Sequence, residues 1–284
     1  MDGNNERSEA AKRFRTRKQT LWKSQAGQTV LGQLSAYFRH CTHGFDDFYP
    51  EQLAALSAIV ERRVTLVKLP TGRGKTVICF AALKLLGGIC VLVCPTNVIV
   101  SNHAQKCPPG ITVVSLPDLN SFDRAPLLDS IAGATAGAPP MLIIGHPQHF
   151  LCQDMLAAFT ESASSLAVSL VCVDEGGLVP DWGHDFRTEF QQLRKLRAAI
   201  ADGVLLPPSL VVLEAACSDE AMEGILLGLG VSEAEQREME VVSAPSDRQE
   251  LRPVFFSQYS STCMFVSVCV CVLFLCLSCV LKHG

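Results

Sequence analysis

The sequence lacks an excess of positive charge. Its 284 residues contain 24 Lys and Arg against 28 Asp and Glu, which gives a net charge of −4 and a pI near 6.0. This balance excludes a generally basic nucleic-acid-binding protein, although it is compatible with a local basic groove. No internal repeat is evident, and the polar, basic start lacks the apolar segment of a signal peptide.

The chain also lacks a cysteine framework, despite its 13 cysteines. Eight of them are scattered over residues 41–217, mostly in expected strands, where cysteine packs as a small hydrophobe. Cys276 and Cys279 form one C-x-x-C pair without a second pair or histidines at zinc-finger spacing. The pattern excludes a disulfide scaffold and a zinc module, and it indicates a reducing compartment.

Apolar residues, by contrast, make up 48% of the chain and gather in short continuous runs. Because these runs show no polar alternation and helical segments separate them, they predict a parallel sheet with helices on both faces. The length indicates one α/β domain of about 200 residues plus tails. The expected strands are 64–67, 90–94, 141–144, 170–173 and 210–213.

A glycine-containing turn, LPTGRGKT at 69–76, joins the first expected strand to an apolar helix. Gly72 and Gly74 let backbone N–H groups point at phosphate oxygens beside the helix N-terminus. Lys75 is placed for the β- and γ-phosphates, and the Thr76 hydroxyl is placed for magnesium. The turn is therefore a candidate site for ATP and Mg²⁺. Its predicted nucleotide-binding residues are Thr71, Gly72, Arg73, Gly74, Lys75 and Thr76.

A second apolar strand ends in the acidic pair Asp174-Glu175, about a hundred residues further on. In P-loop ATPases, carboxylates at the tip of a buried strand hold magnesium and polarise the attacking water. Asp174 is the predicted magnesium residue, together with Thr76, and Glu175 is the predicted water-positioning base. Lys75, Asp174 and Glu175 are thus the candidate catalytic residues.

An aromatic-rich loop follows this pair. Its rings and its guanidinium group could stack on bases, as in proteins that bind single-stranded DNA. A lone tryptophan more often packs inside a protein, but the polar neighbours here would need partners away from water. The candidate nucleic-acid-binding residues are Trp182, His184, Phe186 and Arg187. The string WGHDFR after an acidic strand closely resembles the aromatic-rich loop of RecQ-like DNA helicases of superfamily 2.

The resemblance covers about residues 44–254, with the family's motifs in order. The turn at 69–76 matches the helicase form x-P-T-G-x-G-K-[ST]. HGFDDFYPEQ, at 43–52, is similar to the family's adenine-reading motif, which implies that Phe45 and Tyr49 flank the adenine and Gln52 hydrogen-bonds its edge. Tyr49 stands where these helicases usually carry Arg, so a neutral ring replaces a stacking cation.

Other segments resemble further motifs and depart from them in places. VLVCPTNVIVSN at 91–102 is similar to the first DNA-contacting motif, and DRQELRPV at 247–254 to the connector toward the second lobe. His146-Pro147-Gln148 stands in place of the family's TPE. Glu214 and Ala215 stand where the Thr-Ala-Thr motif couples ATP to DNA.

The resemblance implies a P-loop RecA-like domain of a 3′-to-5′ DNA helicase that uses ATP and Mg²⁺. Its partner would be single-stranded or forked DNA, and its place would be in nuclear DNA repair and recombination. The expected parts are a basic arm (1–40, ordered or disordered), an ATP-binding lobe (41–245), a connector (246–262) and an apolar Cys-rich tail (263–284). The second lobe is missing, and with it the arginine finger, worth about 10³- to 10⁵-fold in rate. This chain alone should therefore hydrolyse ATP poorly and unwind weakly or not at all.

The two ends leave alternatives open. Residues 263–281 are uncharged and 19 long, close to the ~20 that cross a bilayer as a helix. They are a tail anchor to a membrane, a buried segment, or the product of a translated intron or frameshift, since alternating GT codes for Val-Cys. The basic stretch 7–23 is a nuclear address, a phosphate-binding arm, or a solvated, frayed helix.

An alternative function is also open. Gly176-Gly177 replace the Ala-His that follows the acidic pair in relatives, and the partner motif has lost its threonines. The same changes would be found in a catalytically degenerate module that binds nucleotide or nucleic acid without turnover. Such a module would be anchored in a membrane if the tail is genuine.

Overall fold

The computed structural model describes residues 15–16, 18–20, 22–163, 167–175, 192–201, 207–215 and 219–244. The chain divides into two units, 1–246 and 247–284, and the second unit lies wholly outside the described residues. Within the described ranges, every helix is too short or too polar to span a membrane. The candidate anchor at 263–281 is not among them.

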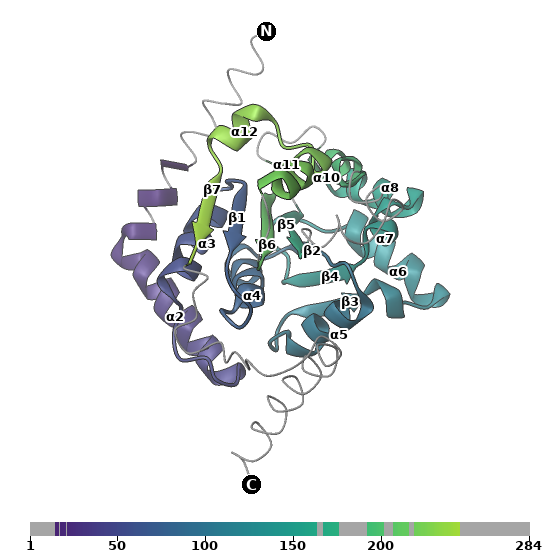
Figure 1. Ribbon diagram of the computed structural model, residues 1–284. Helices are drawn as coiled ribbons and strands as arrows, with labels where there is room; N and C mark the ends of the chain where they lie inside the picture. Colours follow the sequence, from purple (N-terminus) through teal and green to yellow (C-terminus); the bar gives the residue numbers. More distant parts are fainter. Residues whose placement is uncertain are drawn as a thin grey trace, which may run out of the picture. The chain divides into compact units, whose positions relative to one another are not determined.

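A sheet of seven strands, all paired in parallel, forms the centre of the described domain (Figure 1). The strand order is β3-β4-β2-β5-β6-β1-β7. In chain order the strands are β1 (Thr65–Lys68), β2 (Ile89–Val93), β3 (Thr112–Ser115), β4 (Met141–Gly145), β5 (Val168–Asp174), β6 (Ser209–Glu214) and β7 (Glu240–Ser243).

The five predicted strands form the central part of this sheet, with ends within two residues of those expected. The sequence did not reveal β3 and β7, which are the two edge strands. Both have four residues and are only partly buried, so they lack the continuous apolar run by which the central strands were found.

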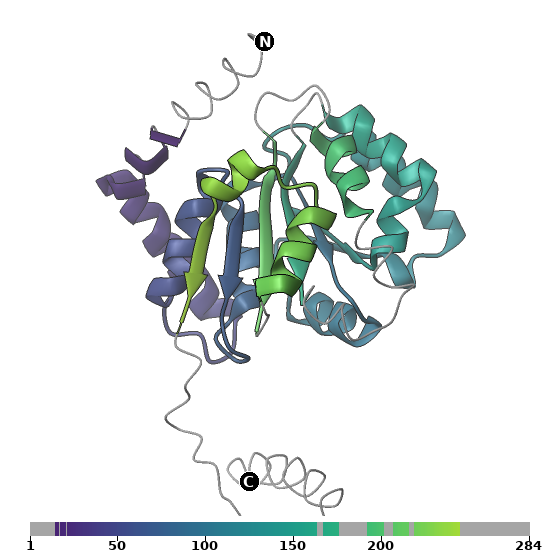
Figure 2. The same cartoon turned by 45° about the horizontal axis from the view of Figure 1, so that its top comes forward.

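Helices cover both faces of the sheet, as predicted. Neighbouring residues of one strand enter different cores: Val91 and Val93 pack on one face, and Cys90 and Leu92 pack on the other. The green helix α11 lies in front of the sheet in Figure 2, and the purple and blue helices lie behind it. This arrangement confirms the α/β fold with a parallel sheet and explains why its strands read as uninterrupted apolar runs.

The helices divide between the two faces. One core contains residues of α2 (Gln25–Cys41), α3 (Pro50–Val60), α4 (Lys75–Leu86) and α5 (Asn97–Lys106). The other contains residues of α6 (Ser121–Ala132), α7 (Pro147–Leu151), α8 (Gln153–Ala163), α10 (Leu193–Ala201) and α11 (Asp219–Gly228). The short 3-10 helix η1 (Leu116–Asp118) follows β3, and α12 (Glu233–Arg237) precedes β7.

Helix α2 lies mostly inside the region expected as a basic N-terminal arm. The Ser24 side chain caps it by accepting a hydrogen bond from the Gly27 amide. Leu34 and Phe38 are buried, and the Phe38 ring lies 5.7 Å, centroid to centroid, from the ring of Phe48. The folded domain therefore starts before residue 41, and the expected boundary falls within a helix whose apolar face belongs to the core.

Gly88 lies close to two other segments of the chain, one at 138–141 and one at Ala167. Its φ of +71° is left-handed, its amide donates to Ala138 O (2.8 Å) and its carbonyl accepts from the Met141 amide (2.9 Å). A Cβ at this position would overlap the carbonyl oxygen of Ala167. Only glycine fits this conformation and this spacing without strain.

We expect Gly88→Ala to lower the free energy of unfolding by about 2–4 kcal/mol, the sum of left-handed strain and backbone overlap. Gly32→Ala is the matched control, because Gly32 is exposed on α2 and a Cβ there meets nothing within 4 Å. It should stabilise the helix by about 0.5–1 kcal/mol. Urea unfolding of both variants is the measurement, and equal midpoints would contradict the packing described for Gly88.

Candidate functional site

The carboxyl ends of five neighbouring strands meet at one edge of the sheet. Because β4, β2, β5, β6 and β1 are parallel and adjacent, the segments that follow them lie together. In open α/β sheets, ligands bind at this edge. The residues at these ends include His146 after β4, Cys94 after β2, Asp174 and Glu175 at β5, Glu214 at β6 and Leu69 after β1.

The turn from β1 to α4 has the backbone that a phosphate site needs. Gly72 and Gly74 have φ values of +82° and +70°, and Gly74 is the N-cap of α4. The Lys75 side chain is buried, and its ammonium donates to Leu69 O at 2.9 Å. Thr76 is half-buried in the first helical turn. Helix-start N–H groups and one ammonium therefore gather at the point where the sequence predicts phosphates.

Gln52 holds this turn from α3. Its side-chain Nε2 donates to the carbonyls of Arg73 (3.2 Å) and Gly74 (3.1 Å), and its Oε1 accepts from the Tyr49 amide (2.9 Å). Only 2% of Gln52 is exposed. A Cβ on Gly74 would lie 2.5 Å from Nε2, so glycine leaves the space for the amide. The expected contact of Gln52 with adenine stays a prediction, because the described contacts of its amide are all with the protein.

Tyr49 has a cationic neighbour that the sequence did not suggest. The guanidinium carbon of Arg73 lies 4.9 Å from the centre of the Tyr49 ring, and 46% of Tyr49 is exposed. A cation from the turn at 69–76 thus lies against Tyr49, the residue that stands in place of the motif's usual arginine. Phe45 is half-buried, with its ring 4.9 Å from that of Phe48, and Phe48 is buried as expected for a core residue.

The acidic pair ends β5. Asp174 is the last residue of the strand and is buried, whereas Glu175 is half-buried. Burial raises the pKa of Glu175, and the Asp174 carboxylate raises it further, while the charges of Lys75 and His103 act in the opposite direction. Glu175 has a φ of +51°, which is strained for a residue with a side chain, and its amide donates to Leu213 O at 2.9 Å. A predicted catalytic residue is therefore held in a sparsely populated backbone conformation.

His103 contacts the acidic pair, although no motif in the sequence points to it. It lies on α5, and its Nε2 is 2.5 Å from Asp174 Oδ2, so the ring donates to the buried carboxylate. Its Nδ1 is buried and has no hydrogen-bond partner within the described part of the chain. The available signal was its spacing, since His103 follows the buried Val100 by three residues and shares its face of the helix.

The substituted HPQ turn is tied to the turn after β2. His146 Nδ1 lies 3.0 Å from Cys94 O, and its Nε2 lies 2.7 Å from Asn97 Oδ1. The Thr96 side chain caps α5 by accepting from the Ile99 amide at 3.2 Å. The loops after β2 and β4 therefore form one connected unit beside the acidic pair.

Several predicted residues fall outside the described ranges. These are the aromatic-loop residues Trp182, His184, Phe186 and Arg187, the pair Gly176-Gly177, and the connector at 246–262. Glu214, in the place of the Thr-Ala-Thr motif, is 2% exposed and pairs in register with Lys68 of β1. Ala215 is half-buried immediately after it.

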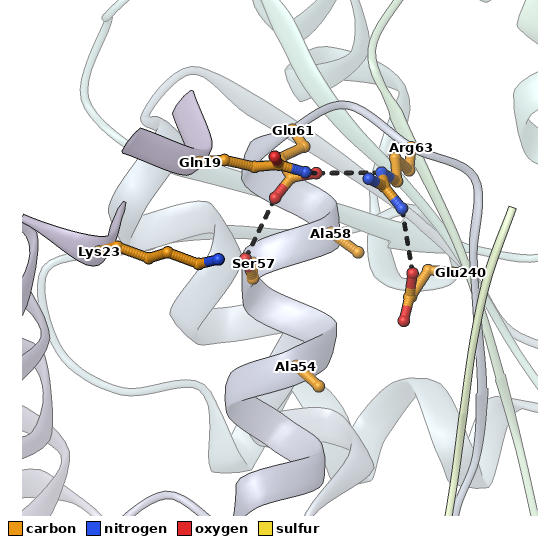
Figure 3. Close-up of a pocket in the computed structure, with 8 residues that line it drawn as sticks. All are labelled: Gln19, Lys23, Ala54, Ser57, Ala58, Glu61, Arg63 and Glu240. Carbon is orange, nitrogen blue, oxygen red and sulfur yellow. Dashed lines mark hydrogen bonds and ion pairs between the residues drawn. The ribbon is translucent and has the colours of Figure 1, made fainter. Parts of the chain in front are cut away.

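A separate polar cavity of about 260 Å³ lies between residues 19–23, α3 and β7 (Figure 3). The buried Glu61 carboxylate accepts from Gln19 Nε2 at 2.9 Å and pairs with Arg63 Nε at 3.0 Å. Arg63 in turn pairs with Glu240 at 3.1 Å, and Lys23 extends toward Ser57. These ion pairs link the segment that follows α3 to the edge strand β7.

Comparisons with known proteins agree with this geometry. The family model described as DEAD/DEAH box helicase matches residues 49–213, more than half of the chain. The structure of the DUF1998 helicase MrfA has a TM-score of 0.54 and 16% identity, and the match covers 76% of this chain and 33% of that one. A second MrfA structure, bound to DNA and AMPPNP, has a TM-score of 0.50. At this identity the two structures show the fold alone.

Curated relatives are similar in sequence over the same region. ATP-dependent DNA helicase Q-like 5 of Arabidopsis thaliana is 25% identical over 189 residues, which cover 66% of this chain and 20% of the relative. Probable ATP-dependent DNA helicase RecS of Bacillus subtilis is 25% identical over 190 residues, which cover 64% and 34%. The chain thus spans a fifth to a third of their lengths. It belongs to the DEAD/DEAH box helicase family, and its relatives include RecQ-like DNA helicases.

Proposed function

We propose that this chain is the ATP-binding and ATP-hydrolysing first lobe of a 3′-to-5′ RecQ-like DNA helicase. One observation carries the proposal: Lys75 and the Asp174-Glu175 pair lie at the same sheet edge, close enough for the Lys75 charge to act on the pKa of Glu175. A phosphate-binding ammonium beside two carboxylates is the arrangement that phosphoryl transfer requires.

The residues of the turn fit ATP with Mg²⁺. The left-handed glycines leave the amides at the start of α4 open to phosphate oxygens, and the buried Lys75 has only to exchange its Leu69 carbonyl for them. Thr76 and Asp174 supply the hydroxyl and carboxylate oxygens that Mg²⁺ prefers. Tyr49, with Arg73 over its ring, and Phe45 offer surfaces for the adenine. Gln52 would hydrogen-bond the adenine edge by exchanging one of its present bonds to Tyr49, Arg73 or Gly74.

Glu175 is the proposed base. Its raised pKa brings it closer to neutral pH than an exposed carboxylate, which favours acceptance of a proton from water. ATP, when bound, supplies the phosphoryl group that is transferred to this water. Nothing else at this edge of the described sheet combines a carboxylate, partial exposure and proximity to Lys75.

The remaining parts of the proposal concern the whole protein. Single-stranded DNA would contact Trp182, His184, Phe186 and Arg187, and a second lobe would follow the connector at 246–262. The relatives' printed names support DNA as the partner, and one MrfA structure is bound to DNA. We place this activity in the nucleus, in DNA repair and recombination. The domain boundaries are those expected from the sequence, except that α2 joins the lobe.

A second candidate is a lobe that binds nucleotide without turnover. One contact favours it, because His103 already occupies an oxygen of Asp174, the proposed magnesium residue. Hydrolysis measurements separate the two candidates, since both predict that nucleotide binds.

Lys75→Ala should weaken ATP–Mg²⁺ binding by about tenfold to a hundredfold, the effect of losing one hydrogen bond to a charged group. Calorimetry on the full chain is the measurement. Lys84→Ala is the control on the same helix, because Lys84 lies over the Tyr37 ring at the other end of α4. Equal affinity of Lys75→Ala and the unsubstituted protein would refute the phosphate site.

Glu175→Gln should reduce the already slow steady-state ATP hydrolysis of this chain by about 10²- to 10⁴-fold while ATP affinity stays unchanged, because glutamine cannot accept the proton. The rate of phosphate release is the measurement. If the unsubstituted protein binds ATP but releases no phosphate, the second candidate is correct and Glu175 has no catalytic role.

Gln52→Ala should weaken ATP binding by about three- to thirtyfold, because the carbonyls of Arg73 and Gly74 lose the two hydrogen bonds that the Gln52 amide donates. Gln28→Ala is the control, since Gln28 is exposed on α2. An ATP affinity equal to that of the control would show that the turn keeps its shape without the Gln52 amide.

Trp182→Ala should weaken binding of single-stranded DNA several-fold or more, since base stacking contributes about 1–3 kcal/mol per base. Fluorescence anisotropy measures the affinity, and thermal unfolding measures the stability. If Trp182 belongs to the core, the variant will unfold at a much lower temperature while its folded fraction binds DNA normally.

A further inference from the structure

Three side chains that can ligate a metal, one of them from the acidic pair, form a buried cluster. Cys94 follows β2, His103 lies on α5 and Asp174 ends β5. Each offers one ligand atom, and the sulfur, nitrogen and oxygen atoms lie within 4.8 Å of one another. All three residues are at least nine-tenths buried. Neither Cys94 nor His103 has a role in the ATP chemistry proposed above.

We propose that Cys94, His103 and Asp174 form a binding site for a thiophilic divalent cation, with Zn²⁺ as the ion that fits the donor set. Thiolate, imidazole and carboxylate are the three side-chain ligands of zinc, and three of them with one water complete a tetrahedral shell. Magnesium prefers six oxygen ligands, so the sulfur and the nitrogen select against the metal of the ATP reaction.

Charge balance supports a doubly charged occupant. Asp174, which is 4% exposed, brings a carboxylate beside the fully buried sulfur of Cys94. A cation of charge +2 compensates one carboxylate and one thiolate, which leaves the site neutral. Buried charges are stable when they are compensated in this way or coordinate a metal.

Small side-chain movements suffice for the ion to enter. Two zinc ligands with bonds of about 2.0 Å lie roughly 3.3 Å apart in a tetrahedral shell. His103 Nε2 and Asp174 Oδ2, now hydrogen-bonded at 2.5 Å, must therefore separate by about 1 Å. The side chains of both residues retain slight exposure, 10% and 6%.

The protons balance without another reactant. Cys94 releases its thiol proton to solvent when sulfur binds the metal. The proton on His103 Nε2 moves to Nδ1, the buried nitrogen that has no partner among the described residues, and the Nε2 lone pair then binds the metal. Net binding of Zn²⁺ thus releases one proton and breaks one hydrogen bond.

Occupancy of this site has a functional consequence that rests on the proposed function. Zn²⁺ would hold Asp174 among its own ligands and withdraw it from nucleotide-bound magnesium. ATP hydrolysis should then fall as the site fills. The binding site itself does not depend on hydrolysis, so it can be tested in the absence of nucleotide.

Cobalt is the probe, because Co²⁺ takes zinc sites and gives a sulfur-to-cobalt charge-transfer band when a thiolate binds it. We expect the full chain to show this band on titration with Co²⁺, with Zn²⁺ displacing the Co²⁺. Cys94→Ser and His103→Gln should each weaken Co²⁺ binding by about tenfold or more. Circular dichroism and thermal unfolding verify that both variants are folded.

Two cysteine controls separate this site from other thiols. Cys41→Ser removes a half-buried thiol on α2, outside the cluster, and should leave the band unchanged. Cys90→Ser removes a thiol whose sulfur lies 3.6 Å from that of Cys79 in the core. Loss of the band in Cys90→Ser with full retention in Cys94→Ser would assign the metal to the core thiols and overturn the proposal.

Inhibition is the second readout. Zn²⁺ should inhibit ATP hydrolysis of the unsubstituted protein at a concentration about tenfold or more below that needed for Cys94→Ser. Equal inhibition of both proteins would overturn the functional consequence. Because the cobalt titration contains no nucleotide, a protein that hydrolyses no ATP still gives a decisive result on the site.

Discussion

The structure depends on one constraint, which is that the parallel sheet is buried on both faces. Neighbouring residues of β2 and β5 enter two separate apolar cores, so neither face accepts a charged group without a large cost. Polar side chains are therefore confined to the strand ends. Asp174, Glu175 and the turn at 69–76 lie together for this reason, because parallel neighbours all end at the same edge.

Gln52 connects this edge to the rest of the domain. Its amide joins the start of α3 to the carbonyls of Arg73 and Gly74, and Gly74 provides the space by having no Cβ. The segment just before α3 carries Phe45 and Phe48, whose rings pack against that of Phe38 in α2. The conformation of the turn at 69–76 is thus linked, through α3 and the segment before it, to the packing of α2 in the core. A substitution in the turn should affect the packing of α2, and a substitution in α2 should affect the turn.

Each feature that could be predicted is a local pattern in the sequence. The central strands are continuous apolar runs, the turn at 69–76 is a glycine turn before a helix, and the acidic pair ends a strand. The edge strands β3 and β7 could not be predicted, since partial exposure removes the run that identifies a strand. The packing of α2 could not be predicted for a related reason, because Leu34 and Phe38 are its only two large buried side chains and the first half of the helix is mostly exposed. Arg73 over Tyr49 is a contact between two motifs, so neither motif by itself reveals it.

The sequence by itself determined the α/β class, the helicase resemblance and the glycine turn between β1 and α4, because these depend on residues close together in the chain. Only the tertiary structure decided what surrounds them. His103 and Asp174 are 71 positions apart, and Cys94 joins them from a third element. Strand order brings β2 beside β5 and α5 over their ends, and pairing across such distances leaves no periodicity in the sequence. Chemistry carried by one segment is readable from the chain, whereas chemistry shared between segments is fixed by packing.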